Sequence, residues 1–291
     1  MDIRELTLYL HLCDTLHFGR TAEQMHVSPS TLSRILKRLE DEVGSQLFER
    51  DNRRVTITTS GTEFQHFAEQ TISQWQTLKN NLAPTKQLTG KLKLYCSVTA
   101  AYSHLPALLD TFRQVHPLIE ITLTTGDAAN ALQEIQNNRA DIAIAALPEP
   151  FPSGLHFAHI DIVPLKIISP KIHCYTQALL TEKQIRWQQL PFIIPDHGPG
   201  RRRTDTWFKD MGIKGNIYAQ VAGYEAITSM VALGCGASII PDAAINNSPV
   251  KNRLLEIESP VTIAPFELGC CCKKQRLNNA IITAFLNVIK G

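Results

Sequence analysis

Residues 19–39 read GRTAEQMHVSPSTLSRILKRL, and this stretch determines the fold of the N-terminal part of the chain. The spacing of its apolar residues predicts two short amphipathic helices separated by a tight turn at His26 and Val27. Ser28 is a favourable N-cap for the second helix, and Pro29 follows at the first helical position. The residues expected in the core are Ala22, Met25, Val27, Leu32, Ile35, Leu36 and Leu39. A short helix that presents Ser, Thr and Arg near its N-terminus is typical of a helix-turn-helix in the DNA major groove.

The segments on either side extend this prediction to a winged helix-turn-helix. Ile3 to His17 fits an amphipathic helix that packs on the other two, and its expected buried residues are Ile3, Leu6, Leu10, Cys13 and Leu16. Residues 47–50 and 55–57 read as two short strands around a polar turn, which predicts a β-hairpin wing. The candidate DNA-binding residues are Ser28, Pro29, Ser30, Thr31, Ser33, Arg34, Arg38, Arg50, Arg53 and Arg54. Arg34 can bond a guanine edge bidentately, and the wing arginines can reach phosphates. The alternative is a helical pair inside another fold, with solvated arginines.

Bulk composition bounds the class of protein but does not by itself indicate DNA binding. The 291 residues carry a net charge of +2, and the first sixty hold eight Lys and Arg against nine Asp and Glu. The argument therefore depends on the distribution of charge, because Ser28 to Leu39 contains three basic residues and no acidic one. An apolar fraction of 44% is typical of a soluble globular protein. Without a membrane-spanning run or a secretory pattern, we expect a cytoplasmic protein that does not bind membranes.

Residues 62–82 contain no Gly or Pro and predict one long helix. Its apolar stripe consists of Phe64, Ala68, Thr71, Trp75, Leu78 and Leu82. The stripe could pack on its own domain or form a two-helix dimer seam. We favour the seam, because the helix joins two domains and little else is present to cover it.

From Lys91 onward, strands alternate with helices, which predicts a parallel sheet covered by helices. The expected strands are residues 92–98, 119–124, 141–145, 192–194, 217–221, 238–241 and 266–272. The expected helices are residues 103–115, 127–138, 202–211, 224–233 and 277–289. Two α/β subdomains with a cleft between them is the economical interpretation. The expected division is residues 1–58 for DNA binding, 59–83 for the linker and dimerisation helix, 84–90 for a hinge, 91–162 with 266–291 for effector subdomain I, and 163–265 for effector subdomain II.

Several polar residues follow the strands of the two subdomains, at the sheet edge where ligands of open α/β folds bind. Hydroxyl groups and helix N-terminal N–H groups can bind a carboxylate there, with Arg201 as a candidate counter-charge. The candidate effector-binding residues are Ser97, Thr99, Ala100, Thr125, His197, Arg201 and Gly223. For each of the side chains there is a simpler alternative. Ser97 and Thr99 could merely cap a helix, His197 could bond to backbone, and Arg201 could be a solvated surface residue.

The sequence contains no signature of an enzyme, a cofactor site or a metal site. No nucleophile elbow, phosphate-binding loop or dinucleotide fingerprint is present, and the pair Ser97 and His104 has no evident third partner. The seven cysteines include no C-x-x-C pair. Cys270, Cys271 and Cys272 are consecutive in a predicted strand, so their side chains point to opposite faces and cannot converge on one metal. We expect reduced thiols, mostly in the core.

The whole chain resembles the LysR-type transcriptional regulators. The resemblance is carried by residues 18–23, 27–34, 39–40 and 44–50, and by Gly234-Cys235-Gly236 running into Pro241. It implies a winged helix-turn-helix, a linker helix and a periplasmic-binding-protein-like effector domain. It further implies a homodimer that assembles into a homotetramer on double-stranded promoter DNA, and a change in DNA bend that lets RNA polymerase engage. A secreted solute-binding protein would explain only the α/β half.

Within that family, the chain is similar to activators of the acetohydroxy acid isomeroreductase gene in isoleucine and valine biosynthesis. The similarity lies in residues 25–34, 96–106, 123–129, 201–203, 225–236 and 265–269, whereas residues 153–190 and the three consecutive cysteines match less well. It implies acetolactate or acetohydroxybutyrate as co-inducer. Ser97, Thr99 and Ala100 would bind its carboxylate, with Thr125, His197 and Gly223 around its hydroxyl and ketone. The alternative is a regulator of another pathway with a different small carboxylate effector.

Overall fold

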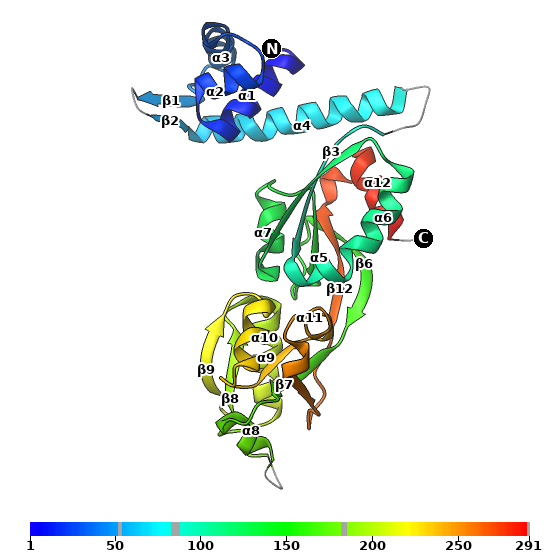
Figure 1. Cartoon of the computed structure of the whole chain (residues 1–291). Helices are drawn as coiled ribbons and strands as arrows, with labels where there is room; N and C mark the ends of the chain where they lie inside the picture. Colours follow the sequence, from blue (N-terminus) through cyan, green and yellow to red (C-terminus); the bar gives the residue numbers. More distant parts are fainter. Residues whose placement is uncertain (52–53, 83–87, 182–184, 290–291) are drawn as a thin grey trace. The chain divides into compact units, whose positions relative to one another are not determined.

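The chain forms two units, Met1–Gln87 and Leu88–Gly291, in a computed structural model that describes residues 1–51, 54–82, 88–181 and 185–289 (Figure 1). Residues 83–87, which include most of the expected hinge, lie outside the described residues. The first unit consists of α1 (Ile3–Thr15), α2 (Phe18–Gln24), α3 (Pro29–Val43), β1 (Phe48–Asp51), β2 (Arg54–Ile57) and α4 (Thr59–Leu82).

The predicted helix-turn-helix is confirmed, including its capping residues. His26 has a positive φ of 53° in the turn, and Ser28 caps α3 by accepting a hydrogen bond from the N–H of Thr31 at 3.1 Å. Gly44 ends α3 in a left-handed conformation with φ 75°, which glycine adopts without strain. Of the expected core residues, Ala22, Leu32, Leu36 and Leu39 are fully buried, and Met25, Val27 and Ile35 are partly buried.

The predicted buried face of α1 is wrong in part. Its buried residues are Glu5, Leu6, Leu8, Tyr9 and Leu12, whereas Leu16 is 41% exposed. The helix is covered from two directions, because Leu8 packs with the helix-turn-helix core and Tyr9 and Leu12 pack in a cluster that includes α4 residues. A face chosen from spacing alone assumes one covering partner, and here there are two.

The helix α4 begins at Thr59 and therefore includes Gly61. A Cβ at Gly61 would overlap the carbonyl oxygen of Leu47, and the carbonyl of Gly61 accepts a hydrogen bond from the Tyr9 hydroxyl at 2.7 Å. The apolar stripe divides into two parts: Phe64 and Ala68 are buried in their own unit, whereas Trp75, Leu78 and Leu82 are 45%, 47% and 74% exposed. Packing on its own domain therefore accounts for the first half of the stripe, and the second half is open to a partner.

The second unit contains a five-stranded sheet and a smaller lobe (Figure 1). The large sheet has the order β4-β3-β5-β12-β6, from β3 (Gly90–Ser97), β4 (Ile119–Gly126), β5 (Ile142–Ala146), β6 (Leu155–Val163) and β12 (Phe266–Lys273). The lobe has a sheet β10-β7-β11, from β7 (Leu165–Pro170), β10 (Ser238–Pro241) and β11 (Leu254–Ile257), and a parallel pair of β8 (Pro191–Pro195) and β9 (Asn216–Val221). The predicted parallel pairing of β3 with β4 and β5 is confirmed, and β12 joins antiparallel.

Helices cover both faces of the large sheet. These are α5 (Val98–Ser103), α6 (Leu105–Val115) and α12 (Ala280–Val288) in one hydrophobic cluster, and α7 (Ala131–Gln136) in the other. Cys270 and Cys272 belong to the first cluster and Cys271 to the second, so neighbouring cysteines face opposite sides as predicted. All three are fully buried free thiols. Burial raises the pKa of Cys271 to about 12 and that of Cys272 to about 11.

Several predicted boundaries near the cleft are wrong. The chain enters α5 directly after β3, because Ser97 caps a helix at Val98; Val98 is therefore helical rather than the end of the strand, and residues 99–102 are helical rather than a loop. The helix α9 (Gly198–Asp210) begins four residues earlier than predicted, and the segment expected as one helix over 127–138 is a 3-10 turn (Ala128–Asn130) followed by α7. The helices α8 (Tyr175–Leu180) and α11 (Asp242–Asn246), and the strands β6, β7 and β11, were not predicted, whereas α10 (Tyr224–Ala232) was. Among the described residues, no helix is long and apolar enough to cross a bilayer.

Candidate functional site

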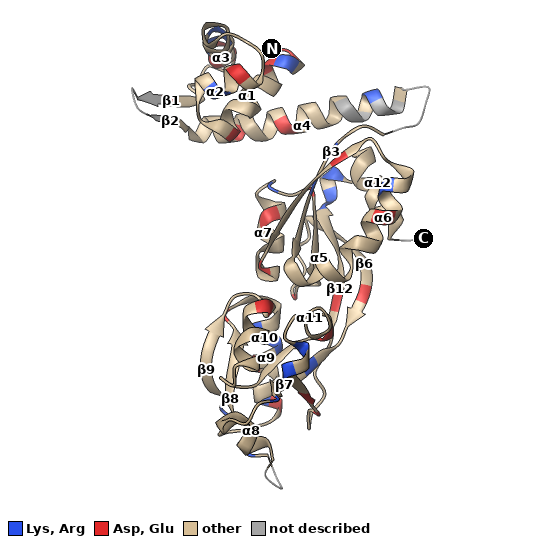
Figure 2. Ribbon diagram, viewed as in Figure 1, with Lys and Arg blue, Asp and Glu red and all other residues tan. Residues whose placement is uncertain are grey.

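The N-terminal turns of α3 form a polar, exposed surface. The hydroxyl of Ser28 lies 2.9 Å from that of Ser30 and 2.8 Å from that of Thr31, so the three hydroxyls form one cluster at the helix N-terminus. Arg34 and Lys37 are exposed further along the helix, and Figure 2 shows basic and acidic residues close together on α3. Because Leu32, Leu36 and Leu39 anchor the opposite face in the core, the polar face of α3 is available to a duplex.

Arg38 differs from the other candidate DNA-binding residues, because it pairs with a buried carboxylate. Its guanidinium forms an ion pair with Glu5 of α1, whose side chain is only 3% exposed. The burial of Glu5 was not predicted, since an acidic residue in the first turn of a helix is usually solvated. The ion pair gives Arg38 a structural role as well, and since 59% of its side chain is exposed, its role in DNA binding stays a prediction.

The wing is present, and its backbone places two of the three candidate arginines. Arg50 lies in β1 opposite Val55, and Arg54 in β2 opposite Asp51, in an antiparallel pair. Arg53 lies outside the described residues. The hairpin position of these residues agrees with the prediction of a wing that follows the recognition helix.

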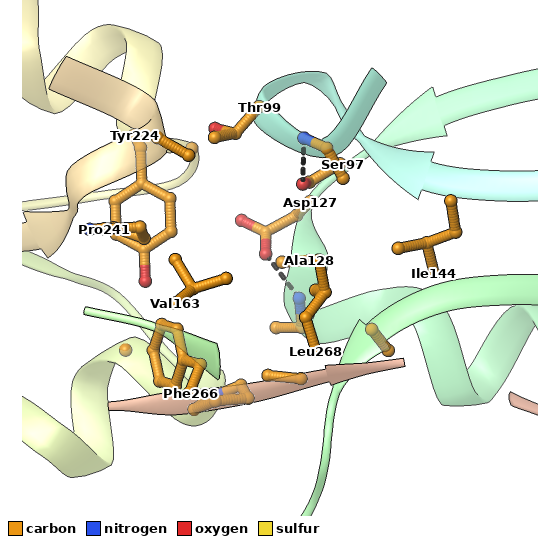
Figure 3. A pocket seen from close by; sticks show the side chains of 18 of the residues that line it. Ser97, Thr99, Asp127, Ala128, Ile144, Val163, Tyr224, Pro241, Phe266 and Leu268 are labelled. Atoms are coloured by element: carbon orange, nitrogen blue, oxygen red, sulfur yellow. Dashed lines mark hydrogen bonds between the residues drawn. The ribbon is translucent and has the colours of Figure 1, made fainter. Parts of the chain in front are cut away.

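The second candidate site is a pocket in the second unit, between the large sheet and the smaller lobe (Figure 3). From the large sheet it is lined by the ends of β3, β4 and β5 and by the start of α5. The other side comes from the loops that follow β8 and β9 and from Tyr224 and Glu225 of α10. Val163, Phe266 and Leu268 form its apolar floor, and Figure 3 shows the carboxylate of Asp127 pointing between Tyr224 and Ser97. The pocket thus lies at the carboxyl ends of parallel strands, where ligands of such folds bind.

The first predicted loop lines this pocket, with its polar groups already engaged. Ser97 Oγ accepts a hydrogen bond from the N–H of Ala100 at 3.1 Å, so Ser97 caps α5, and its role in effector binding stays a prediction. Thr99 is 8% exposed, and its hydroxyl donates a hydrogen bond to Glu225 Oε1 at 2.8 Å. This bond joins the two sides of the pocket. A ligand at this position would have to replace it.

Two of the other candidates line the pocket and two do not. His197 and Gly223 belong to the lining, and the imidazole of His197 lies 2.6 Å from Asp196. In the described part of the chain, Thr125 and Arg201 are outside the lining. Thr125 is exposed on the edge strand β4, and the guanidinium of Arg201 donates to Asp205 at 2.9 Å and to Gln220 at 2.7 Å. The early start of α9 places Arg201 one turn before Asp205, and the two therefore pair along the helix. The role of Arg201 as a counter-charge to the effector stays a prediction.

Sequence reasoning did not select Asp127, Glu225, Tyr224 or His104, all of which line the pocket. Their positions in the sequence could have indicated three of them, because residues directly after the strands lie at the sheet edge where ligands bind. Asp127 comes directly after β4, and Tyr224 and Glu225 follow β9 within four residues. Asp127 Oδ1 accepts the N–H of Ala129 at 2.7 Å. Burial raises the pKa of Tyr224 above its usual value, so its hydroxyl stays protonated and can donate.

One group near the pocket could hold a metal ion. Ligand atoms of Asp127, Asp196 and His197 lie within 4.8 Å of one another. Their partners within the protein, the Ala129 N–H for Asp127 and the Asp196–His197 pair, already account for the arrangement. Exposed acidic groups of this kind are common without a metal.

Comparison with known proteins identifies the family. Residues 3–62 match the family described as bacterial regulatory helix-turn-helix protein, lysR family, and residues 85–291 match the LysR substrate binding domain. This chain is a LysR-type transcriptional regulator. The regulator is 46% identical over 293 residues to the HTH-type transcriptional activator IlvY of Salmonella typhimurium, covering 99% of both chains. It is also 46% identical over 287 residues to IlvY of Haemophilus influenzae, covering 98% of both. Because such relatives are transcriptional activators, the regulator is not an enzyme.

Solved structures show the same fold. A full-length OxyR from Pseudomonas aeruginosa matches this LysR-type regulator with a TM-score of 0.71 and 23% identity, covering 100% of this chain and 95% of that one. Full-length CbnR in complex with its target DNA matches with a TM-score of 0.64 and 18% identity, covering 100% and 99%. At these identities the likeness concerns the fold alone. It agrees with a winged helix-turn-helix, a linker helix and an α/β effector domain in one chain.

Proposed function

We propose that this protein activates the acetohydroxy acid isomeroreductase gene of isoleucine and valine biosynthesis, with acetolactate or acetohydroxybutyrate as co-inducer. The observation that carries the proposal is the 46% identity to IlvY activators, which extends over nearly the entire chain. The pocket supports a small ligand, because polar groups at two helix N-termini converge there above an apolar floor. As a cytoplasmic DNA-binding protein, it would act where both the chromosome and these metabolites are found.

In this proposal each segment has a distinct role. Residues 1–58 bind promoter DNA through Ser28, Pro29, Ser30, Thr31, Ser33 and Arg34, with the wing residues Arg50, Arg53 and Arg54 on the backbone. Residues 59–83 pair two protomers through the exposed half of the α4 stripe, and dimers associate into a homotetramer. Residues 84–90 form the hinge. Residues 91–162 with 266–291, and residues 163–265, form the two effector subdomains around the pocket.

The co-inducer acts by binding the two arrangements of the effector domain with different affinity, since a ligand with equal affinity for both shifts nothing. Ser97, Thr99, Ala100, His197 and Gly223 contribute to its site. The resulting change in DNA bend lets RNA polymerase engage the promoter. No metal or further cofactor enters this mechanism.

Gel-shift titration of the full chain tests the DNA-binding part. A promoter fragment of the isomeroreductase gene should bind more tightly than a scrambled fragment of the same length and composition. Equal affinity for the two fragments at several salt concentrations would contradict the proposal.

Transcription in vitro tests the effector. Adding acetolactate should raise transcription with the wild-type protein, and Thr99→Ala should abolish the response with promoter affinity unchanged. A normal response in Thr99→Ala would show that the pocket is not the effector site. A response only to a different small carboxylate would favour the alternative of a regulator of another pathway.

A further inference from the structure

The charged groups of the pocket do not match a simple carboxylate ligand. Its lining contains two carboxylates, those of Asp127 and Glu225, and two histidines, His104 and His197; within the described ranges it contains no Lys or Arg. Arg201, the expected counter-charge, pairs with Asp205 instead. An anion that entered this pocket would therefore approach Glu225 without a Lys or Arg side chain from the lining beside it. Such a pocket needs a ligand that also brings a hydrogen-bond donor to the carboxylates.

The Thr99–Glu225 hydrogen bond shows where that donor would be placed. Thr99 is in the first turn of α5, and Glu225 is in the first turn of α10 on the opposite side of the pocket. A carboxylate has only acceptor atoms, so Glu225 is satisfied here by the hydroxyl of Thr99. The distance from Thr99 Oγ1 to Glu225 Oε1 is 2.8 Å, and Thr99 is 8% exposed.

Glu225 is placed at the end of the pocket by the start of α10. It lies near the N-terminus of α10, where the helix dipole stabilises a negative charge. Gly223 precedes the helix with φ 82°, and a Cβ at Gly223 would lie 3.4 Å from Glu225 Oε2. Although Glu225 as a residue is exposed, its carboxylate is folded back beside Gly223 and reaches the hydroxyl of Thr99 across the pocket.

We infer that Glu225 accepts a hydrogen bond from a hydroxyl group of the effector, and that this makes the pocket selective for hydroxy acids. The effector would exchange one pair of bonds for another: Thr99 turns its hydroxyl to the effector's carboxylate, and the effector's hydroxyl replaces Thr99 as donor to Glu225. An acid of the same shape without the hydroxyl would engage the Thr99 hydroxyl through its own carboxylate. Glu225 would then lack this hydrogen-bond donor and lie beside the negative charge of the bound acid. This inference rests on the proposed small-acid effector and deepens it by naming the group that Glu225 recognises.

The test uses two acids that differ only in the hydroxyl, 2-hydroxy-2-methylbutanoate and 2-methylbutanoate, titrated calorimetrically into the full-length protein. The wild type should bind the hydroxy acid about 10- to 100-fold more tightly, the range expected for a hydrogen bond to a charged acceptor. In Glu225→Ala this ratio should fall to within about threefold of unity. Equal affinity for the two acids in the wild type, or an unchanged ratio in Glu225→Ala, would overturn the inference.

Three further variants separate recognition from a structural role. Glu225→Gln keeps the shape and one acceptor atom, and should give an intermediate ratio; a wild-type ratio in this variant would also overturn the inference. Thr99→Val removes the bond between the two sides but keeps Glu225, so it should weaken both acids and leave their ratio above about tenfold. Ser229→Ala, on the same helix, removes only a bond to the Glu225 carbonyl and is the matched control, with both affinities unchanged.

Acetolactate titrated in parallel distinguishes this inference from the proposed function. A preference for the hydroxy acid without acetolactate binding would refute acetolactate as the effector and support the role of Glu225. Acetolactate binding with an unaltered ratio in Glu225→Ala would support the effector and refute the role of Glu225.

Discussion

Replacing Arg38 by Ala should destabilise the first unit, although the side chain of Arg38 is 59% exposed. One carboxylate oxygen of Glu5 accepts the N–H of Asp2 at 2.9 Å, and the other pairs with Arg38. The substitution would remove the Arg38 cation from a carboxylate that is 3% exposed, and would leave the N-terminal ammonium of Met1, 3.6 Å from Glu5 Oε2, as its remaining cation. Breaking a fully buried pair costs about 3–5 kcal/mol. Because Arg38 is partly solvated and Glu5 keeps its bond to Asp2, we expect a smaller loss of about 1–3 kcal/mol.

Hydrogen exchange of the full-length protein measures this loss locally. Amides of α1 and α3 that exchange through opening of the first unit should exchange about 5- to 150-fold faster in Arg38→Ala, since 1.4 kcal/mol corresponds to about tenfold. Arg34→Ala is the matched control, because Arg34 is exposed on the same helix and should leave exchange unchanged. The double variant Glu5→Gln with Arg38→Ala should recover part of the protection. Wild-type exchange rates in Arg38→Ala would refute the structural role of the ion pair.

Three other outcomes follow from particular residues. Arg34→Ala should weaken specific DNA binding by about 1–3 kcal/mol in gel-shift titration, and unchanged discrimination between promoter and random DNA would contradict its base-reading role. Gly61→Ala should destabilise the protein by about 1–3 kcal/mol, because the added Cβ would overlap the carbonyl oxygen of Leu47. Circular dichroism should show a lower melting temperature, and an unchanged melting temperature would be inconsistent with that contact. Cys272, with a pKa raised to about 11, should resist iodoacetamide at pH 8 in the native protein while the half-buried Cys174 is labelled, as mass spectrometry would show. Rapid labelling of Cys272 would argue against its burial.

Local sequence signals predicted the DNA-binding half well. Ser28 as N-cap, Pro29 at the first helical position and Leu32, Leu36 and Leu39 at helical spacing act within a few residues, so they can be read without a tertiary structure. The burial of Glu5 could not be predicted in the same way. It depends on Arg38, which is 33 residues away in sequence and is brought close only by the packing of α1 on α3.

The pocket could be located from the sequence more reliably than its contacts could be assigned. The alternation of strands and helices placed Ser97, Thr99, His197 and Gly223 at the correct edge, because side chains after parallel strands share one end of the sheet. The direction in which each of these side chains points could not be predicted as well from the sequence. Arg201 turned out to face Asp205, since the start of α9 at Gly198 sets which side of the helix each residue occupies.

The amino-acid sequence by itself determined the helix-turn-helix, the wing, the α/β order of the second unit and the family, because these depend on periodicity, capping and contiguous motifs. Only the tertiary structure decided that Glu225 meets Thr99, that Arg38 neutralises Glu5 and that the α4 stripe is half covered. Each of these depends on groups far apart along the chain, and their approach is set by how whole elements pack rather than by any local pattern.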